Sequence, residues 1–263
     1  MEYEDFLYEK RDGVATITYN RPELGNRVTT KTMEDLPFPL LDAEGDDSIG
    51  VVVITGAGRE AFCIGGDWKV HRDRSQTNFR QHLAKALHVY TIIRNLGKPV
   101  ICAVNGRAEA GGNQIAAVCD FTIAAEHAVF SQHGMKRGSA PFLWGIQMLP
   151  LIIGEKRAKE MLLLCREYTA QEAYEIGLVN KVVPYEDLYA ETDRWCQNLL
   201  DLSPQSVRLA KTSFNFRSDL HYPAIYHGRE FLSLMAGTPE LREGASAAVE
   251  GREPDFRKFR RPG

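Results

Sequence analysis

Two glycine pairs, each placed after an apolar and β-branched segment, constrain the fold of this chain most. The run IGVVVITGAG (residues 49–58) precedes the first pair, in AFCIGGD (residues 61–67). The run KPVICAVNG (residues 98–106) precedes the second pair, in AEAGGNQ (residues 108–114), which opens a segment of helical character. Continuous β-branched runs bounded by glycine are typical of strands buried on both faces. The sequence therefore predicts two buried strands, each followed by a glycine turn.

The rest of the chain predicts an α/β core followed by helices. Strand-like residues flank Asp12-Gly13, a hairpin signal, and residues 80–95 carry apolar side chains at helical spacing. From Lys156 onward two helices precede a strand, and Thr169 with Glu172 forms a capping box at the second helix. Amphipathic helices then continue almost to the end. We expect residues 1–190 to form the core and residues 191–263 a helical C-terminal region.

Charge and cysteine usage exclude several classes of function. The net charge of −3 gives no electrostatic footprint for nucleic acid or an anionic membrane, so neither is expected as a partner. The cysteines are scattered without the spacing of a zinc site, and no metal site is expected. An odd cysteine count without a signal peptide favours a reducing, cytoplasmic setting. No apolar run reaches the ~18 residues that a membrane span needs.

The glycine pairs allow three interpretations. Neither matches GxGxxG with a later acidic residue, nor GxxxxGK[ST], which disfavours a nucleotide-phosphate cradle. Both can be tight turns that need positive φ. Alternatively, the N–H groups of two such turns, near helix N-termini, can converge on one oxyanion. The parallel placement of the two pairs favours the third interpretation.

Several longer motifs, in a fixed order, carry a family resemblance. They are NRPE (residues 20–23), VVVITGAGREAFCIGGD, KPVICAVNGRAEAGGNQIAAVCDFTIAAEHAVFSQHGMKRGS and AYEIGLVNKVV. Together they resemble the enoyl-CoA hydratase/isomerase (crotonase) superfamily over nearly the whole chain. Within it, AFCIGGD-x-K, GMKRGS and the tail REPDFRKFRR are most similar to dihydroxynaphthoyl-CoA synthase and ketocyclohexane-carboxyl-CoA hydrolase.

The resemblance implies a fold, an assembly and a substrate. It implies a spiral of ββα units and a C-terminal helical region that assembles a homotrimer, or a homohexamer of two trimers. The substrate would be an acyl-CoA thioester, with coenzyme A as part of the substrate and no other cofactor. The N–H groups of Gly66 and Gly111 would form an oxyanion hole for the thioester carbonyl. CoA would lie along Ile64, Gly65, Asp67 and Trp68, with Lys258 at a CoA phosphate.

The residues that move protons in this family are replaced here. Gln114 and Gly134 occupy the positions of the two glutamates of family hydratases. Pro141 stands where the naphthoyl synthase pattern has its catalytic aspartate, and Ala236 aligns with its tyrosine. Neither reaction therefore transfers directly to this chain.

Other polar residues remain as candidates for catalysis or substrate binding. Glu109 would sit against an apolar wall that raises its pKa toward that of a useful base, or would pair with Arg107. His133 would shuttle protons or be structural, and Ser139 would hydrogen-bond the acyl portion. His71 is expected in solvent, and the aromatic residues Trp68, Phe142 and Trp144 belong either to an acyl pocket or to the core.

Three functions follow. The first is carbon–carbon bond cleavage or closure on a cyclic or β-keto acyl-CoA. The second is hydration or isomerisation of an enoyl-CoA with a non-standard base such as Glu109 or His133. The third is CoA binding without catalysis.

Overall fold

The computed structural model describes residues 3–68, 72, 75–141 and 144–260, so the expectations for His71 and Phe142 lie outside the described residues. The larger sheet has six strands in the order β1-β2-β3-β5-β7-β10. These are β1 (Phe6–Arg11), β2 (Val14–Tyr19), β3 (Val51–Gly56), β5 (Val100–Val104), β7 (Phe121–Ala125) and β10 (Lys181–Val183). Only the β1–β2 pair is antiparallel among these strands, and Arg11 opposite Val14 confirms the predicted turn at Asp12-Gly13.

The smaller sheet holds four short strands in the order β4-β6-β8-β9. They are β4 (Ala61–Cys63), β6 (Arg107–Glu109), β8 (Val129–Ser131) and β9 (Tyr168–Thr169). Three times in succession, the chain thus places one strand in the large sheet, the next in the small sheet, and then a helix: β3-β4-α4, β5-β6-α5 and β7-β8-α6. The predicted spiral of ββα units is confirmed.

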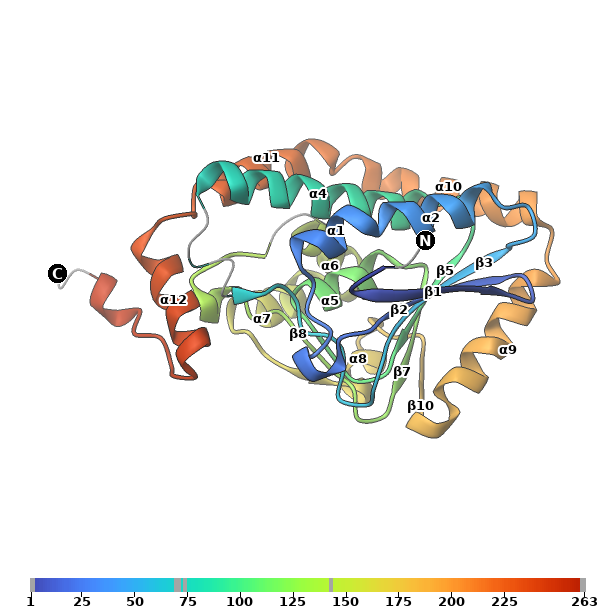
Figure 1. Cartoon of the computed structure of the whole chain (residues 1–263), viewed down its shortest axis with the longest axis horizontal. Coiled ribbons are helices and arrows are strands. Elements are labelled where there is room, and N and C mark those ends of the chain that lie inside the picture. The colour runs from blue at the N-terminus through green and yellow to red at the C-terminus, as the bar shows by residue number, and fades with distance from the viewer. Residues whose placement is uncertain (1–2, 69–71, 73–74, 142–143, 261–263) are drawn as a thin grey trace.

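Helices surround the two sheets and extend beyond them at the C-terminal end of the chain (Figure 1). They are α1 (Thr30–Asp35), α2 (Pro37–Gly45), α4 (Gln76–Asn95), α5 (Gly111–Val118), α6 (Trp144–Ile153), α7 (Glu155–Leu163), α8 (Ala170–Glu175), α9 (Leu188–Leu200), α10 (Pro204–Asp219), α11 (Tyr222–Ser233) and α12 (Pro239–Glu250). Short 3₁₀ turns are η1 (Pro22–Leu24), η2 (Met135–Arg137), η3 (Tyr185–Asp187) and η4 (Arg257–Phe259). Thr169 and Glu172 form the predicted capping box of α8.

The β-branched run of β3 is buried on both faces. Val52 and Ile54 join the main core, on the side of α4 and α5. Val51 and Val53 point to the opposite face, where they pack with Leu188 of α9. This explains why β3 shows no polar alternation.

The C-terminal helices extend the molecule away from the sheet. The expected division at residue 190 falls inside α9, which packs on the large sheet, while α10 and α11 lie beside α4 (Figure 1). Helix α12 projects at the end of the molecule opposite α9 (Figure 1). Within the described ranges, no helix has the length and apolarity needed to cross a membrane.

Candidate active site

The small sheet brings the two glycine turns together. Strands β4 and β6 are parallel neighbours with Cys63 opposite Ala108, so the chain leaves both strands at the same edge. Residues 64–66 and 110–111 therefore meet. A Cβ added to Gly65 would lie 2.9 Å from the Ala110 Cβ and 3.4 Å from the Gly111 nitrogen. The two turns are in direct contact.

Special backbone conformations hold this contact. Gly65 has φ +85°, and Ala110 adopts φ +47°, which is strained for a residue with a side chain. The Ala110 N–H donates to the Ser131 carbonyl at 3.0 Å, and the Gln132 side-chain amide donates to the Ala110 carbonyl at 3.1 Å. A Cβ on Gly112 would lie 2.0 Å from the Cys63 carbonyl oxygen, so only glycine lets α5 begin there.

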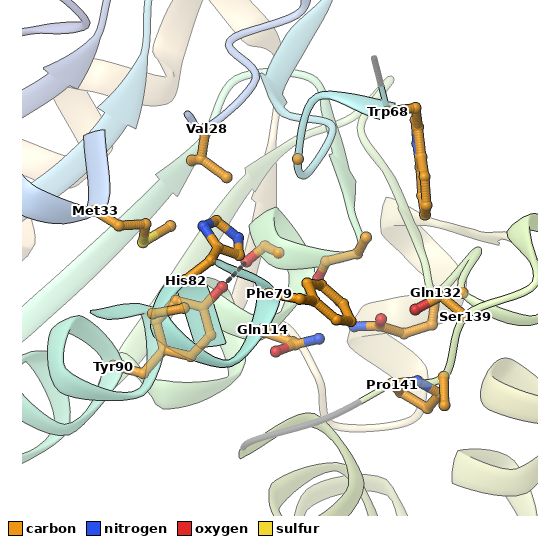
Figure 2. Close-up of a pocket in the computed structure, with 16 residues that line it drawn as sticks. Val28, Met33, Trp68, Phe79, His82, Tyr90, Gln114, Gln132, Ser139 and Pro141 are labelled. Atoms are coloured by element: carbon orange, nitrogen blue, oxygen red, sulfur yellow. Dashed lines mark hydrogen bonds between the residues drawn. The ribbon is translucent and has the colours of Figure 1, made fainter. Parts of the chain in front are cut away.

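A small cavity of about 70 Å³ opens where the turns meet. Gly66 and Gly111 both line it. Their N–H groups donate no hydrogen bond to a backbone carbonyl within the part of the chain that the structure describes. Gly111 is also the first residue of α5, where N–H groups lack helical partners and the helix dipole is positive. The remaining lining residues, most of them labelled in Figure 2, are Val28, Met33, Trp68, Phe79, His82, Ala86, Tyr90, Ala110, Gln114, Gln132, Gly134, Ser139, Ala140 and Pro141.

The cavity is apolar with a few neutral polar groups. Among the described residues that line it, none is an aspartate or a glutamate. Gln114 is buried, and its Oε1 has no hydrogen-bond partner among the described residues. Ser139 lines the cavity as expected, and Tyr90 reaches it from α4 (Figure 2). Burial raises the pKa of the Tyr90 hydroxyl, so this group stays neutral.

Glu109 and His133 do not line this cavity but lie in a network of charged groups, which agrees with the structural alternative for both residues. The Glu109 carboxylate pairs with the Arg107 guanidinium, and its other oxygen lies 3.4 Å from His133 Nδ1. Burial raises the pKa of Glu109, but the hydrogen bonds from His133 and Arg107 outweigh burial, so its pKa is lowered from the ordinary value. The expected upward shift is wrong. The pairing with Arg107 that the sequence left open is the one observed.

The same cluster includes Glu167 and resembles a metal site in its donor atoms. Ligand atoms of Glu109, His133 and Glu167 lie within 4.8 Å of one another. The Arg107 guanidinium contacts both carboxylates, at 2.7 Å in the case of Glu167. The positive charge of Arg107 already balances these two carboxylates. Glu109, His133 and Glu167 therefore belong to an ion-pair network.

A second, more polar groove of about 260 Å³ adjoins the cavity. Trp68 lines both, so the groove and the cavity meet at this side chain. Arg27 lines the groove and donates to the Gly66 carbonyl at 3.2 Å, while Arg21 pairs with Asp5 at 3.2 Å. The lining is Arg21, Leu24, Arg27, Thr29, Asp67, Trp68, Ala248 and Val249.

Three other expected residues lie apart from the cavity. Lys258 in η4 pairs with Glu243 at 2.7 Å and lines neither the cavity nor the groove. The Ile64 N–H donates to the Gly25 carbonyl at 3.1 Å, which fixes the strand end before the first turn. Trp144 is fully buried and packs edge-on against Tyr222, so it belongs to the core.

No sequence motif marks His82, or Arg21 and Arg27 of the groove, as residues of the site. His82 lies in an amphipathic helix, and the direction in which that helix faces depends on tertiary packing. The spacing of Phe79, His82, Ala86 and Tyr90 is the signal that could have found it, because these positions share one helix face.

Comparison with known proteins agrees with this architecture. A family profile described as enoyl-CoA hydratase/isomerase matches residues 9–259. An enoyl-CoA hydratase from Mycobacterium avium subsp. paratuberculosis K-10 superposes with a TM-score of 0.89 at 28% identity, covering 97% of this chain and 99% of that one. An enoyl-CoA hydratase/isomerase from Xanthobacter autotrophicus Py2 gives 0.86 at 31% identity and covers 100% of both chains. Carnitinyl-CoA hydratase from Mycobacterium avium gives 0.86 at 28%, covering 98% of this chain and 100% of that one. This chain belongs to the enoyl-CoA hydratase/isomerase family, whose members process acyl-CoA substrates.

Proposed function

We propose that this protein is an enzyme that binds an acyl-CoA and stabilises its thioester enolate between the N–H groups of Gly66 and Gly111. The observation that carries the proposal is that the two turns touch and line one small cavity. As negative charge develops on the thioester oxygen, two fixed donors bind it more strongly than they bind the neutral carbonyl. One donor of this kind is worth roughly 3–4 kcal/mol of transition-state stabilisation.

The adjoining groove is our proposed site for coenzyme A. It begins at Trp68, beside the cavity, and carries Arg21 and Arg27, whose guanidinium groups suit phosphate oxygens. CoA in the groove would pass Ile64, Gly65, Asp67 and Trp68, as the resemblance implies, and place the thioester at Gly66. Lys258 keeps its proposed phosphate contact only if CoA competes with Glu243 for its ammonium group.

The reaction we favour is carbon–carbon bond cleavage or closure on a cyclic or β-keto acyl-CoA. The cavity supports it through its apolar and aromatic lining, including Trp68 and Phe79, which suits a compact ring. The absence of carboxylates from its described lining disfavours hydration by a glutamate pair. In a retro-Claisen cleavage, water attacks the β-carbonyl carbon, the bond between the α and β carbons breaks, and its electron pair becomes the enolate.

Hydration or isomerisation of an enoyl-CoA is the second candidate. The solved relatives at 28–31% identity carry the names enoyl-CoA hydratase and enoyl-CoA hydratase/isomerase. Both reactions also pass through a thioester enolate, so the same pair of N–H donors would serve them. A member of the family that binds CoA without catalysis is the third reading.

An exposed apolar face supports a homotrimer or a homohexamer. Large apolar side chains on and beside α10 and α11 are well exposed in the single chain: Leu209, Phe214, Phe216, Leu220, Phe231 and Leu234. Exposed patches of this kind mark interfaces. We propose that copies of the chain cover this face.

A substrate panel tests the proposal. Purified protein is titrated with CoA and then assayed with β-ketoacyl-CoA, 2-enoyl-CoA and 3-enoyl-CoA thioesters. We expect CoA binding and turnover of a β-keto thioester to an acyl-CoA and a carboxylic acid. Turnover of only the enoyl substrates supports the second candidate, and tight binding with no turnover supports the third. Failure to bind CoA contradicts all three.

A further inference from the structure

One face of α4 carries the ionisable groups of the cavity. Phe79, His82, Ala86 and Tyr90 line it, at successive spacings of three, four and four residues, so they form a single stripe on the helix. All four side chains are buried. An apolar helix stripe would serve packing alone, whereas two positions of this stripe carry hydrogen-bonding groups.

The stripe faces the second glycine turn. The Tyr90 hydroxyl lies 3.4 Å from the Gly111 carbonyl oxygen, and a Cβ on Gly111 would lie 3.2 Å from that hydroxyl. His82 lies two helical turns before Tyr90 and points into the same cavity (Figure 2). Both side chains line the same cavity of about 70 Å³ as Gly66 and Gly111, which would hold the thioester oxygen.

His82 is the one described lining residue suited to exchanging a proton near neutral pH. Histidine is the side chain whose ordinary pKa lies in that range. Burial keeps the Tyr90 hydroxyl protonated, and the amides of Gln114 and Gln132 do not titrate. Glu109 and His133 lie outside the cavity, in the ion-pair network with Arg107.

We propose that His82 is the proton carrier of this site, an inference that rests on the proposed function. An imidazole nitrogen uses its lone pair to take a proton from the α carbon. The C–H electron pair forms the carbon–carbon double bond of the enolate, and the carbonyl π pair moves to the oxygen held by Gly66 and Gly111. The imidazolium then returns the proton to carbon, so the step consumes no other reagent. In a retro-Claisen cleavage, the same nitrogen takes its proton from the attacking water and delivers it to the enolate.

Hydrogen–deuterium exchange at the α carbon measures this step without any downstream chemistry. Butyryl-CoA is incubated in D₂O with wild-type protein, His82→Gln or His88→Gln, and deuterium uptake is followed by mass spectrometry. His88 is the matched control, because it lies on the same helix but is exposed to solvent. Calorimetric titration with CoA shows in parallel whether each variant retains its binding site.

We expect His82→Gln to lose exchange by about 10²-fold or more, the usual size of general-base catalysis, with CoA affinity unchanged. His88→Gln should exchange like the wild type. The wild-type exchange rate should fall as pH is lowered through the range where histidine protonates. This acid loss should be absent from the residual exchange of folded His82→Gln, which a purely structural role would not predict, and His82→Asn replaces that variant if it does not fold.

Two failures are distinguishable. Exchange in the wild type that persists within a few fold in folded His82→Gln overturns the role of His82 and leaves the proposed function standing. A pH profile of exchange that is the same in the wild type and in folded His82→Gln does the same. Wild-type protein that binds CoA but exchanges no α proton overturns the enolate proposal, and the role of His82 with it.

Discussion

A Cβ placed on Gly65 would lie 2.9 Å from the Cβ of Ala110, although 45 residues separate the two positions in the chain. This contact joins the first glycine turn to the second. Neither turn can shift without displacing the other, so the N–H groups of Gly66 and Gly111 are held in one arrangement before any ligand binds. Such preorganisation is what makes a pair of backbone donors effective in stabilising developing charge.

Gly65→Ala should therefore damage both stability and activity. The positive φ of Gly65 costs an alanine about 1–2 kcal/mol, and the contact with Ala110 adds to that cost. A displacement of about 1 Å at the oxyanion hole can cost about 10² in rate. Urea unfolding and α-proton exchange measure the two effects.

Gly154→Ala is the matched control. Gly154 has a similar φ of +80°, but a Cβ there meets nothing within 4 Å. It should show the backbone cost alone and keep normal exchange. Equal stability and equal exchange in the two variants would contradict the importance of the contact between the turns.

Glu109→Gln should retain turnover within a few fold at neutral pH. Glu109 does not line the cavity, and its lowered pKa makes it a poor base. The measurement is the substrate panel with wild type and variant side by side. A large loss of turnover in a folded Glu109→Gln protein would show that Glu109 takes part in the reaction.

The lowered pKa of Glu109 predicts how the stability of the protein depends on pH. Because its folded-state pKa is lowered, ionised Glu109 stabilises the protein above the unfolded-state pKa of about 4.3, and this stabilisation is lost as pH falls through the folded-state value. The difference in unfolding free energy between wild type and Glu109→Gln should therefore shrink on acidification from pH 7. A difference that grows toward acidic pH would show that the assigned sign is wrong.

Arg27→Gln should weaken CoA binding about tenfold or more. A hydrogen bond from a charged group contributes about 1.5–3 kcal/mol, and Arg27 lines the groove we assign to CoA. The remaining affinity should also depend less on salt. Arg11→Gln is the control, since its side chain is 83% exposed and lies on β1. Calorimetric titration at two salt concentrations gives the answer, and unchanged affinity in Arg27→Gln would place CoA elsewhere.

Phe214→Glu should dissociate the assembly. Phe214 is the most exposed large apolar side chain among the described residues, at 83%, and it lies on α10. Sedimentation velocity should show a trimer or hexamer for the wild type and smaller species for the variant. Leu7→Glu on β1, also exposed, should leave the assembly intact. A monomeric wild-type protein would contradict the proposed role of the α10–α11 face.

The sequence predicts the architecture better than it predicts the site. Unbroken β-branched runs favour strands buried on both faces, and the capping box at Thr169 is purely local, so both are found as expected. The meeting of the two turns depends on the parallel pairing of β4 with β6. These strands have three residues each, and no local sequence pattern predicts that they pair. The approach of Gly65 to Ala110 follows from that pairing.

Side-chain direction explains the errors in the site. Arg107 and Glu109 stand two apart on β6, and residues two apart on a strand share a face, so their pairing was open to prediction. His82 required knowledge of which face of α4 turns toward the second glycine turn. That orientation arises from packing of α4 against distant segments, including α1 and α11.

The most direct test of the central claim is a crystal structure of the protein with a bound acyl-CoA. We predict that the thioester carbonyl oxygen lies about 2.7–3.2 Å from both the Gly66 nitrogen and the Gly111 nitrogen. A thioester seated in the cavity with its oxygen bound by neither N–H, or by other groups, would contradict it.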